Sequence, residues 1–244
     1  MTKPYSINVY DLLTVDNVCN QILREAIKLP EVSMAHVIMD AGNVSLLHQH
    51  SKMSEIYYIL EGEGILYHGS QALKVKNGAY LTIPPETSHK LRNIGKSQLE
   101  HLVFAIPPFD PTDLTLLDES SEIEPEPKPF RSDKTHIIAQ DGASIYELLS
   151  EKEREIMDIG LATGSLPPKR KAIPHKHEIS DEVYYVISGK GRVKVGDLDN
   201  KVKEGIVIYV PVNMVHALEN TGSEELEVLC LSSPAYTDED FILV

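Results

Sequence analysis

The sequence predicts an all-β fold of two tandem jelly-roll barrels, each a double-stranded β-helix. From Val32 onward, short runs of β-favouring residues alternate with turns containing Gly, Asn and Asp, which is typical of an antiparallel sandwich or barrel. A set of His, Glu, Gly and Pro residues also occurs twice, because His48 recurs as His175 and His89 as His216, each 127 positions later. Jelly-roll closure protects strand edges that would otherwise be exposed.

The predicted elements follow this pattern along the chain. In the first half, strands are expected near residues 32–39, 43–50, 55–60, 63–68, 71–76, 79–83, 89–93 and 98–106. The segment from Val18 to Leu29 is compatible with a short helix or with a strand that enters the barrel. We expect an N-terminal barrel over residues 1–117, an acidic Pro-containing linker over 118–135 and a C-terminal barrel over 136–244.

A histidine pair marks the predicted functional centre of the first half. His48 and His50 are two residues apart in a β-favouring stretch, so both imidazoles point to one face of the strand. Glu55 follows after a short polar break, and His89 begins a more distant strand. These four side chains converge only if the sheet curls on itself.

The second half repeats this set with the same spacing. The repeated ligands are His175, His177, Glu182 and His216. The same offset relates Gly62 to Gly189, Gly78 to Gly205, Pro84 to Pro211, Asn93 to Asn220 and Tyr57 to Tyr184. A repeat of this length indicates two duplicated domains and not a solenoid.

Two spaced motifs in each half resemble those of the cupin family. The first motif is read from Gly42, His48, His50, Glu55 and Gly62, and the second from Gly78, Pro84, His89 and Asn93. Departures from the family pattern are Glu86 and Asn213 at an inner glycine and Lys169 at the opening glycine. The resemblance covers nearly the whole chain and implies a bicupin, with two barrels and one metal-binding set in each.

Three imidazoles and one carboxylate suit a divalent transition metal and leave roughly two coordination positions open. We therefore expect one metal per barrel, held by His48, His50, Glu55 and His89 and by His175, His177, Glu182 and His216. The donor types do not distinguish between Fe, Mn, Ni, Co and Zn. A metal with a purely structural role is an alternative.

Composition narrows the expected partners. A formal net charge of −14 argues against nucleic acid and anionic membrane surfaces, because both require a basic face. No apolar run has the length of a signal peptide or a membrane span, so a cytoplasmic location is the expectation. The expected partner is a small-molecule substrate, and formation of a homodimer stays open. Of the two cysteines, Cys230 lies in an apolar run and is interpreted as a buried small hydrophobe.

Three residues of the first barrel are candidate catalytic groups. His101 replaces Val228 on the expected inward face of the last strand, and His36 replaces Thr163. Both are expected to carry protons near neutral pH, with Tyr57 as a hydrogen-bond donor, so that the first barrel would support most of the turnover. The alternative is that the histidines are satisfied wall residues and that Tyr57 serves only for packing.

The resemblance implies a metal-dependent enzyme that acts on a small oxygenated or acidic organic molecule, with a dioxygenase-like oxidoreductase as the first expectation. A non-redox isomerase or lyase acting on a keto acid or sugar derivative, and a non-catalytic ligand-binding bicupin, are the alternatives. Bicupin oxalate decarboxylases usually place an arginine two residues before the first histidine and a tryptophan within the pair. Here Leu46 and Gln49, then Ile173 and Lys176, occupy those positions, which counts against that reaction.

Overall fold

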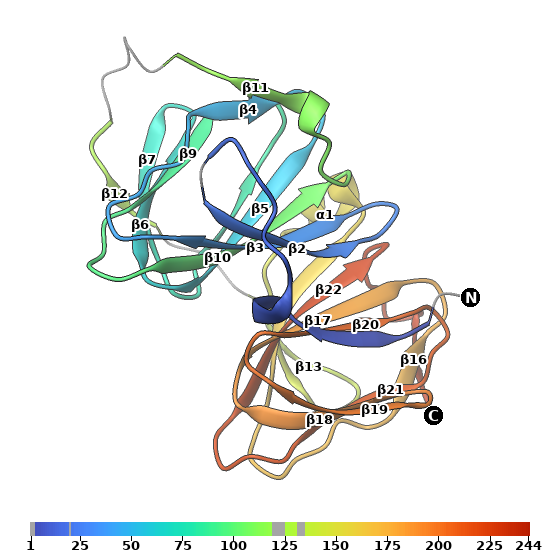
Figure 1. The fold of residues 1–244 in the computed structure, drawn as a ribbon. Coiled ribbons are helices and arrows are strands. Elements are labelled where there is room, and N and C mark those ends of the chain that lie inside the picture. The colour runs from blue at the N-terminus through green and yellow to red at the C-terminus, as the bar shows by residue number, and fades with distance from the viewer. Residues whose placement is uncertain (1–2, 20, 119–124, 131–134) are drawn as a thin grey trace. The chain divides into compact units, whose positions relative to one another are not determined.

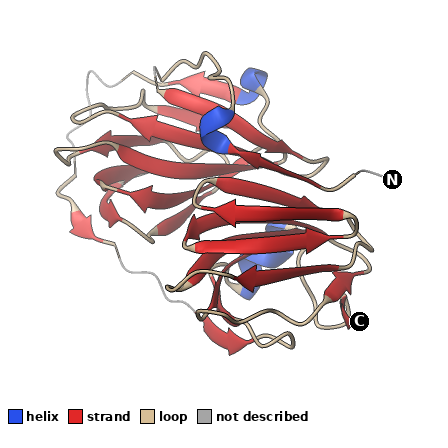
Figure 2. Cartoon of the chain, turned by 60° about the horizontal axis from the view of Figure 1, so that its bottom comes forward, coloured by secondary structure: helices blue, strands red, loops and turns tan. Residues whose placement is uncertain are grey.

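The computed structural model describes residues 3–19, 21–118, 125–130 and 135–244, and these residues are mostly in strands (Figures 1 and 2). The chain divides into two compact units. The first barrel is formed by Leu12–Ser132, and the second barrel by Asp133–Val244 together with Met1–Asp11. Within the described residues, no helix has the length and apolar character needed to cross a membrane.

Two sheets build the first barrel. The five-stranded sheet has the order β2 (Ile22–Lys28), β3 (Ser33–Met39), β10 (Leu99–Ile106), β5 (Ser54–Glu61) and β8 (Tyr80–Ile83). The six-stranded sheet has the order β11 (Leu114–Leu116), β4 (His48–His50), β9 (His89–Asn93), β6 (Glu63–His68), β7 (Gln71–Lys76) and β12 (Lys128–Pro129). A short 3₁₀ helix, η2 (Pro111–Asp113), precedes β11. Chain neighbours such as β3 and β4 lie in different sheets, as a jelly roll requires.

The second barrel has the same plan. Its seven-stranded sheet has the order β1 (Tyr5–Asn8), β20 (Ile206–Val210), β17 (Asp181–Ser188), β22 (Leu226–Ser233), β15 (Gly160–Leu166), β14 (Ser144–Glu147) and β13 (Thr135–Ile138). The five-stranded sheet has the order β19 (Leu198–Lys203), β18 (Lys190–Val195), β21 (His216–Asn220), β16 (His175–His177) and β23 (Phe241–Leu243). The all-β prediction of two jelly-roll barrels is confirmed.

Apolar side chains from both sheets fill each barrel. In the first barrel, the core cluster includes Met39, Ile59, Leu66, Leu91 and Leu99, all at most 1% exposed. Full burial of one such side chain stabilises a fold by roughly 1.5–3 kcal/mol. A matching cluster fills the second barrel. The ligand residues therefore stand on strands held rigidly by packing.

A close backbone approach explains one of the repeated glycines. Gly62 joins β5 to β6 with φ of +87°, and a Cβ atom there would lie 2.8 Å from the carbonyl oxygen of Gln98. Gly189 has φ of +86° at the corresponding turn of the second barrel. Only glycine fits both the dihedral angle and the space at these turns.

The departures from the glycine pattern keep the left-handed backbone. Lys169 has φ of +62°, compared with +76° at Gly42 in the other half. Glu86 and Asn213 have φ of +61° and +63°. Their amides donate to the carbonyl oxygens of the ligands His50 and His177, at 2.6 Å in each case, so the unusual turn is tied to the histidine strand.

The N-terminal strand belongs to the second barrel and not, as predicted, to the first. The predicted first domain began at residue 1, but β1 pairs antiparallel with β20 of the second barrel, with Tyr5 opposite Tyr209 (Figure 1). The short 3₁₀ helix η1 (Val9–Asp11) follows it. The segment from Val18 to Leu29, left open between helix and strand, forms strand β2 from Ile22 to Lys28. An edge strand is selected by its partner, and this partner lies about 200 residues away along the chain.

Two further segments refine the sequence predictions. Helix α1 (Glu151–Met157) was not predicted, although Ser150 and Glu153 form a capping box around its first turn. In the predicted linker, β12 pairs in parallel with β7, and Phe130 packs against the core of the first barrel. The linker positions 119–124 and 131–134 lie outside the described residues.

Candidate metal centres and cavity

Each barrel gathers one His₃-Glu set. The first quartet consists of His48, His50, Glu55 and His89, and the second quartet of His175, His177, Glu182 and His216. Within each quartet, one ligand atom from every residue lies within 4.8 Å of the others. The imidazoles come from one sheet and the carboxylate from the other, since His48 on β4 faces His89 on β9 while Glu55 lies on β5. The structure thus gathers all eight predicted ligand residues, four in each barrel.

The imidazole orientations suit metal ligation. Nδ1 of His48, His89, His175 and His216 lies 2.8–3.0 Å from the backbone carbonyl oxygen two residues earlier. This hydrogen bond places the proton on Nδ1 and turns an unprotonated Nε2 toward the other ligands. Nε2 of His50, His177 and His216 is buried without a well-oriented hydrogen bond, and in His177 and His216 it lies 3.4 and 3.0 Å from the carboxylate of the ligand Glu182. Buried nitrogens that face one another in this way fit a shared cation.

The pKa values of several ligand side chains are shifted by burial and by their neighbours. Burial, together with the neighbouring His89, lowers the pKa of His48 to about 4, so this imidazole is neutral at pH 7. Burial raises the pKa of Glu55, but the 2.9 Å contact with Nε2 of His89 and the other nearby imidazoles outweigh it, so the pKa is lowered overall. The same balance holds the pKa of Glu182 well below its usual range. The neutral His48 imidazole beside an ionised carboxylate is in the form that binds a divalent cation. In the second quartet, burial lowers the pKa of His177, but the Glu182 and Asp240 carboxylates outweigh it and raise that pKa overall.

A cavity of about 190 Å³ opens onto the second quartet. One water molecule needs only about 10–15 Å³ of such space, so the cavity accommodates a small organic molecule. Its apolar walls include Ile145, Leu166, Leu218, Leu226 and Val228, and its polar lining includes Asp141, Glu147, Arg154, Tyr184, Tyr236 and Asp238. The ligands His175, His177 and Glu182 are among its lining residues. Tyr184 donates a hydrogen bond of 2.7 Å to Glu182 from the cavity wall.

One cross-strand pair distinguishes the two interiors. In the second barrel, Gly164 on β15 lies opposite Val228 on β22, and both line the cavity. At the same register in the first barrel, Val37 lies opposite His101. The pair beside the cavity is therefore smaller in the second barrel than the corresponding pair in the first.

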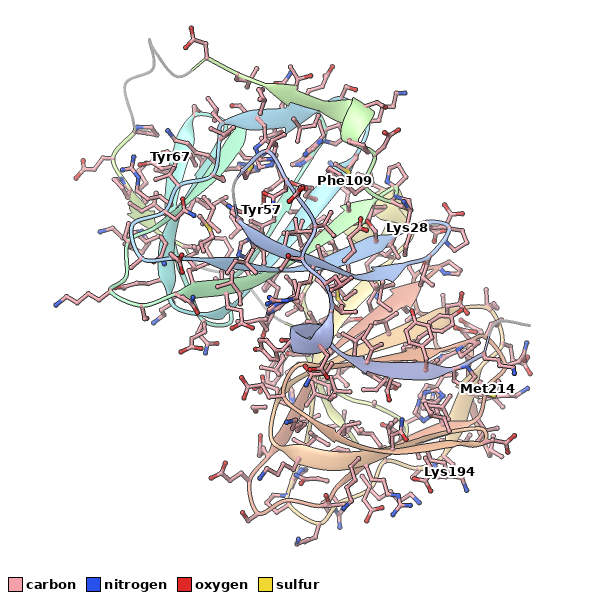
Figure 3. All side chains as sticks on the ribbon, viewed as in Figure 1. Lys28, Tyr57, Tyr67, Phe109, Lys194 and Met214 are labelled. Atoms are coloured by element: carbon pink, nitrogen blue, oxygen red, sulfur yellow. The ribbon has the colours of Figure 1, made fainter. Side chains whose placement is uncertain are left out.

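Two of the three candidate catalytic residues lie together in the first barrel. The rings of His101 and Tyr57 are 5.2 Å apart, and Tyr57 lies 6.0 Å from the ligand His89 (Figure 3 labels Tyr57). Burial, with the charge of His36 nearby, lowers the pKa of His101 to about 3. Burial and the Glu55 carboxylate raise the pKa of Tyr57 well above its usual range. Both groups keep one protonation state around pH 7, in contrast to the proton exchange expected for His101.

The third candidate, His36, faces the other side of the sheet. It lies opposite Leu102 on β10, whereas its neighbour Val37 lies opposite His101. Successive side chains of a strand point to opposite faces, so His36 and His101 are separated by the sheet. The Nε2 atom of His36 is paired with the carboxylate of Glu100 on that outer face. The prediction that His36 adds a titratable group to the first pocket is therefore wrong.

Sequence reasoning missed two buried carboxylates beside the quartets. Asp113 and Asp240 are 8% and 2% exposed and contact the loops between the His-x-His pair and the glutamate. They are related by the 127-residue offset, as are Phe109 and Tyr236, whose rings lie 6.4 Å from His50 and 6.0 Å from His177. The 127-residue offset could therefore have identified Asp113 and Asp240 as a repeated pair, although they lie outside the motifs.

The fold and the two quartets define a duplicated jelly-roll protein with two sites consistent with one divalent metal each. A family model described as "Cupin domain" matches residues 35–105 and 163–232. The chain belongs to the cupin family and contains two cupin domains, which makes it a bicupin.

Several relatives match one half of the chain. The uncharacterized protein MJ1618 of Methanocaldococcus jannaschii is 37% identical over 103 residues, which is 42% of this chain and 82% of the relative. The oxalate-binding protein of Thermotoga maritima is 32% identical over 113 residues, covering 46% of this chain and 88% of the relative.

Solved oxalate decarboxylases match both halves at once. The Lactobacillus farciminis enzyme, in a formate complex, has a TM-score of 0.75 and 16% identity, covering 100% of this chain and 89% of the enzyme. The Bacillus subtilis enzyme has a TM-score of 0.71 and 17% identity, covering 98% of this chain and 78% of that enzyme. Identities this low show a shared fold only.

Proposed function

We propose that this bicupin is a metal-dependent enzyme that binds a small oxygen-bearing organic molecule in the second barrel and oxidises it with dioxygen. The observation that carries the proposal is the cavity of about 190 Å³ whose lining includes His175, His177 and Glu182. This assignment moves the main site from the first barrel, expected from sequence, to the second.

The donor set determines what a bound cation would contribute. A divalent metal held by the second quartet would polarise an oxygen atom of the substrate, and a redox-active metal would permit oxidation by dioxygen. The chain's own groups shape the rest of the site. Val228, Leu226 and Leu218 exclude water around the substrate body, and the Tyr184 hydroxyl orients Glu182 by its 2.7 Å hydrogen bond.

Charge in the cavity narrows the substrate class. Asp141, Glu147 and Asp238 line it in addition to Glu182, and Arg154 is the only lysine or arginine among its described lining residues. Arg154 is already paired with Glu147 at 2.9 Å. Even with a divalent cation bound, the lining carboxylates outweigh the positive charge. A neutral molecule with an apolar body, or one that ionises only at the oxygen facing the metal, fits this lining better than a dianion.

A second candidate is a non-redox reaction or simple binding of a small carboxylate such as oxalate. The observation in its favour is the 32% identity to a protein named oxalate-binding. The acidic lining and the size of the cavity in the second barrel count against a two-carbon dianion there. Leu46 and Ile173, at the positions where related decarboxylases usually carry arginine, are 44% and 47% exposed.

In the first barrel we propose a supporting role for His101 and Tyr57. Both lie on the interior side, and Tyr57 is close to the ligand His89. As groups of fixed protonation, they would hydrogen-bond a ligand of the first quartet and would not carry protons through a turnover.

The test combines metal analysis with oxygen consumption. Elemental analysis of the purified protein comes first, followed by oxygen uptake of iron-loaded protein with diols, β-diketones and catechols. The proposal expects uptake with at least one neutral oxygen chelator and no uptake with oxalate. Conversion of substrate without oxygen uptake would favour a non-redox reaction. Turnover of oxalate would favour a small carboxylate as the substrate.

A further inference from the structure

Two of the six ligand histidines lack the backbone hydrogen bond that orients the other four. In His48, His89, His175 and His216, Nδ1 is held by the carbonyl group two residues earlier. His50 and His177, the second histidines of each His-x-His pair, have no such bond, and their Nδ1 atoms are buried. A metal-bound imidazole normally donates its other N–H to a carboxylate, carbonyl or water, which fixes its orientation.

Beside His177 this partner is Asp240. Its Oδ2 atom lies 3.4 Å from Nδ1 of His177, and the side chain is buried. The carboxylate also accepts the amides of Ile179 and Ser180 at 2.5 and 3.3 Å and the Ser180 hydroxyl at 2.5 Å. Asp240 directly precedes β23, whose Phe241 lies opposite His177 in the sheet. One carboxylate thus contacts a ligand histidine and the loop that leads to the ligand Glu182.

The corresponding carboxylate of the first barrel is used differently. Asp113 accepts the amides of Ser51, Lys52 and Met53 at 3.0–3.2 Å and is also bonded to the Ser51 hydroxyl. The loop takes up these acceptor positions. Within the described residues, no ion pair joins the Asp113 carboxylate to His50 as Asp240 is joined to His177 at 3.4 Å, and Asp113 approaches His50 through its backbone instead.

We propose that Asp240 is a positioning residue of the second metal centre, which aims Nε2 of His177 at the cation, whereas Asp113 only fixes the loop. This inference rests on the metal-binding part of the proposed function and not on the reaction. Asp240, which lies outside the family motifs, would thus contribute to the metal affinity of the second barrel only.

The experiment measures cobalt binding to the full chain carrying His48→Ala, so that the second quartet is observed alone. Removal of an outer carboxylate typically weakens metal affinity 10–100-fold. We expect Asp240→Asn to weaken Co²⁺ binding by about 10–100-fold and to alter the visible cobalt spectrum, because the imidazole loses its fixed orientation. Glu239→Gln, at an exposed neighbouring position, is the matched control and should change neither.

Two more variants separate positioning from loop stability. Ser180→Ala removes one hydrogen bond of the loop without touching His177, so it should lower the melting temperature and leave cobalt affinity within about twofold. In a His175→Ala background, which leaves the first quartet intact, Asp113→Asn should likewise lower the melting temperature and leave the cobalt affinity within about twofold. Unchanged cobalt affinity in Asp240→Asn, or an equal loss in Ser180→Ala, would overturn the inference. Absence of cobalt binding before any change at Asp240 would instead overturn the proposed metal site itself.

Discussion

The two barrels carry the same ligands in the same geometry and differ in the wall beside them. Both quartets place three imidazoles on one sheet and a carboxylate on the other. The interior pair is Val37 with His101 in the first barrel and Gly164 with Val228 in the second. The ligands determine where a cation can bind, and we propose that this cross-strand pair determines how much room a substrate has beside it.

The largest effects are expected from the ligands themselves. His48→Ala and His175→Ala should each remove about one equivalent of metal, because three remaining donors hold a divalent cation much more weakly. Turnover should be lost in His175→Ala and retained in large part in His48→Ala. Elemental analysis and activity assays of both variants check this. Equal loss of turnover in both would break the proposed division of labour between the barrels.

Metal removal should destabilise the whole protein. A ligand present at 100 times its Kd stabilises the folded state by about 2.7 kcal/mol. Treatment with a chelator should therefore lower the melting temperature, and each single ligand variant should show a smaller chelator effect. A melting temperature that does not respond to chelator would argue that the isolated quartets bind no metal under those conditions.

Filling the cavity should sharpen the comparison. A Cβ atom on Gly164 would lie 3.0 Å from Cδ1 of Ile145 and 3.6 Å from Cγ2 of Val228. Gly164→Val should weaken binding of a neutral chelator at least about tenfold, which corresponds to about 1.4 kcal/mol, without loss of metal. Its overpacking should cost about 1–3 kcal/mol of stability.

The matched change in the first barrel is Val37→Gly, which should leave chelator binding in the second barrel unchanged. Titrations of both variants provide the test. If Gly164→Val binds the chelator as the wild type does, the cavity does not hold the substrate.

The smallest effects are expected at the left-handed turns. A residue with a Cβ atom is disfavoured in this region by about 1–2 kcal/mol, and asparagine tolerates it best. Glu86→Gly and Lys169→Gly should each stabilise their barrel by about 1 kcal/mol, and Asn213→Gly should do so by less. Denaturant unfolding of the metal-free protein measures this order. A larger gain at Asn213 than at Glu86 would contradict it.

The ligand sets were predictable because their signal is local and doubled. The i, i+2 spacing of His48 and His50 fixes a common face, and most strands of the first half lie within a residue or two of their predicted positions. His36 was misassigned because strand parity must be counted through the partner strand, where Val37 and not His36 faces His101.

Other features depend on contacts that no local pattern specifies. Strand β1 acquires its place from β20, about 200 residues away. Gly164 and Val228 face each other in the lining of the cavity, and the sequence shows neither this register nor the space beside it. Asp240 lies outside the motifs, and only the 127-residue offset from Asp113 would have directed attention to it.

Small molecules should reach a cation bound by the second quartet. The most direct test is a spectral titration of cobalt-loaded His48→Ala and His175→Ala proteins with a neutral 1,3-diketone. We expect the cobalt spectrum to change with saturation in His48→Ala, where the second quartet is intact, and to stay unchanged in His175→Ala. A spectral change confined to His175→Ala would contradict it and return the substrate site to the first barrel.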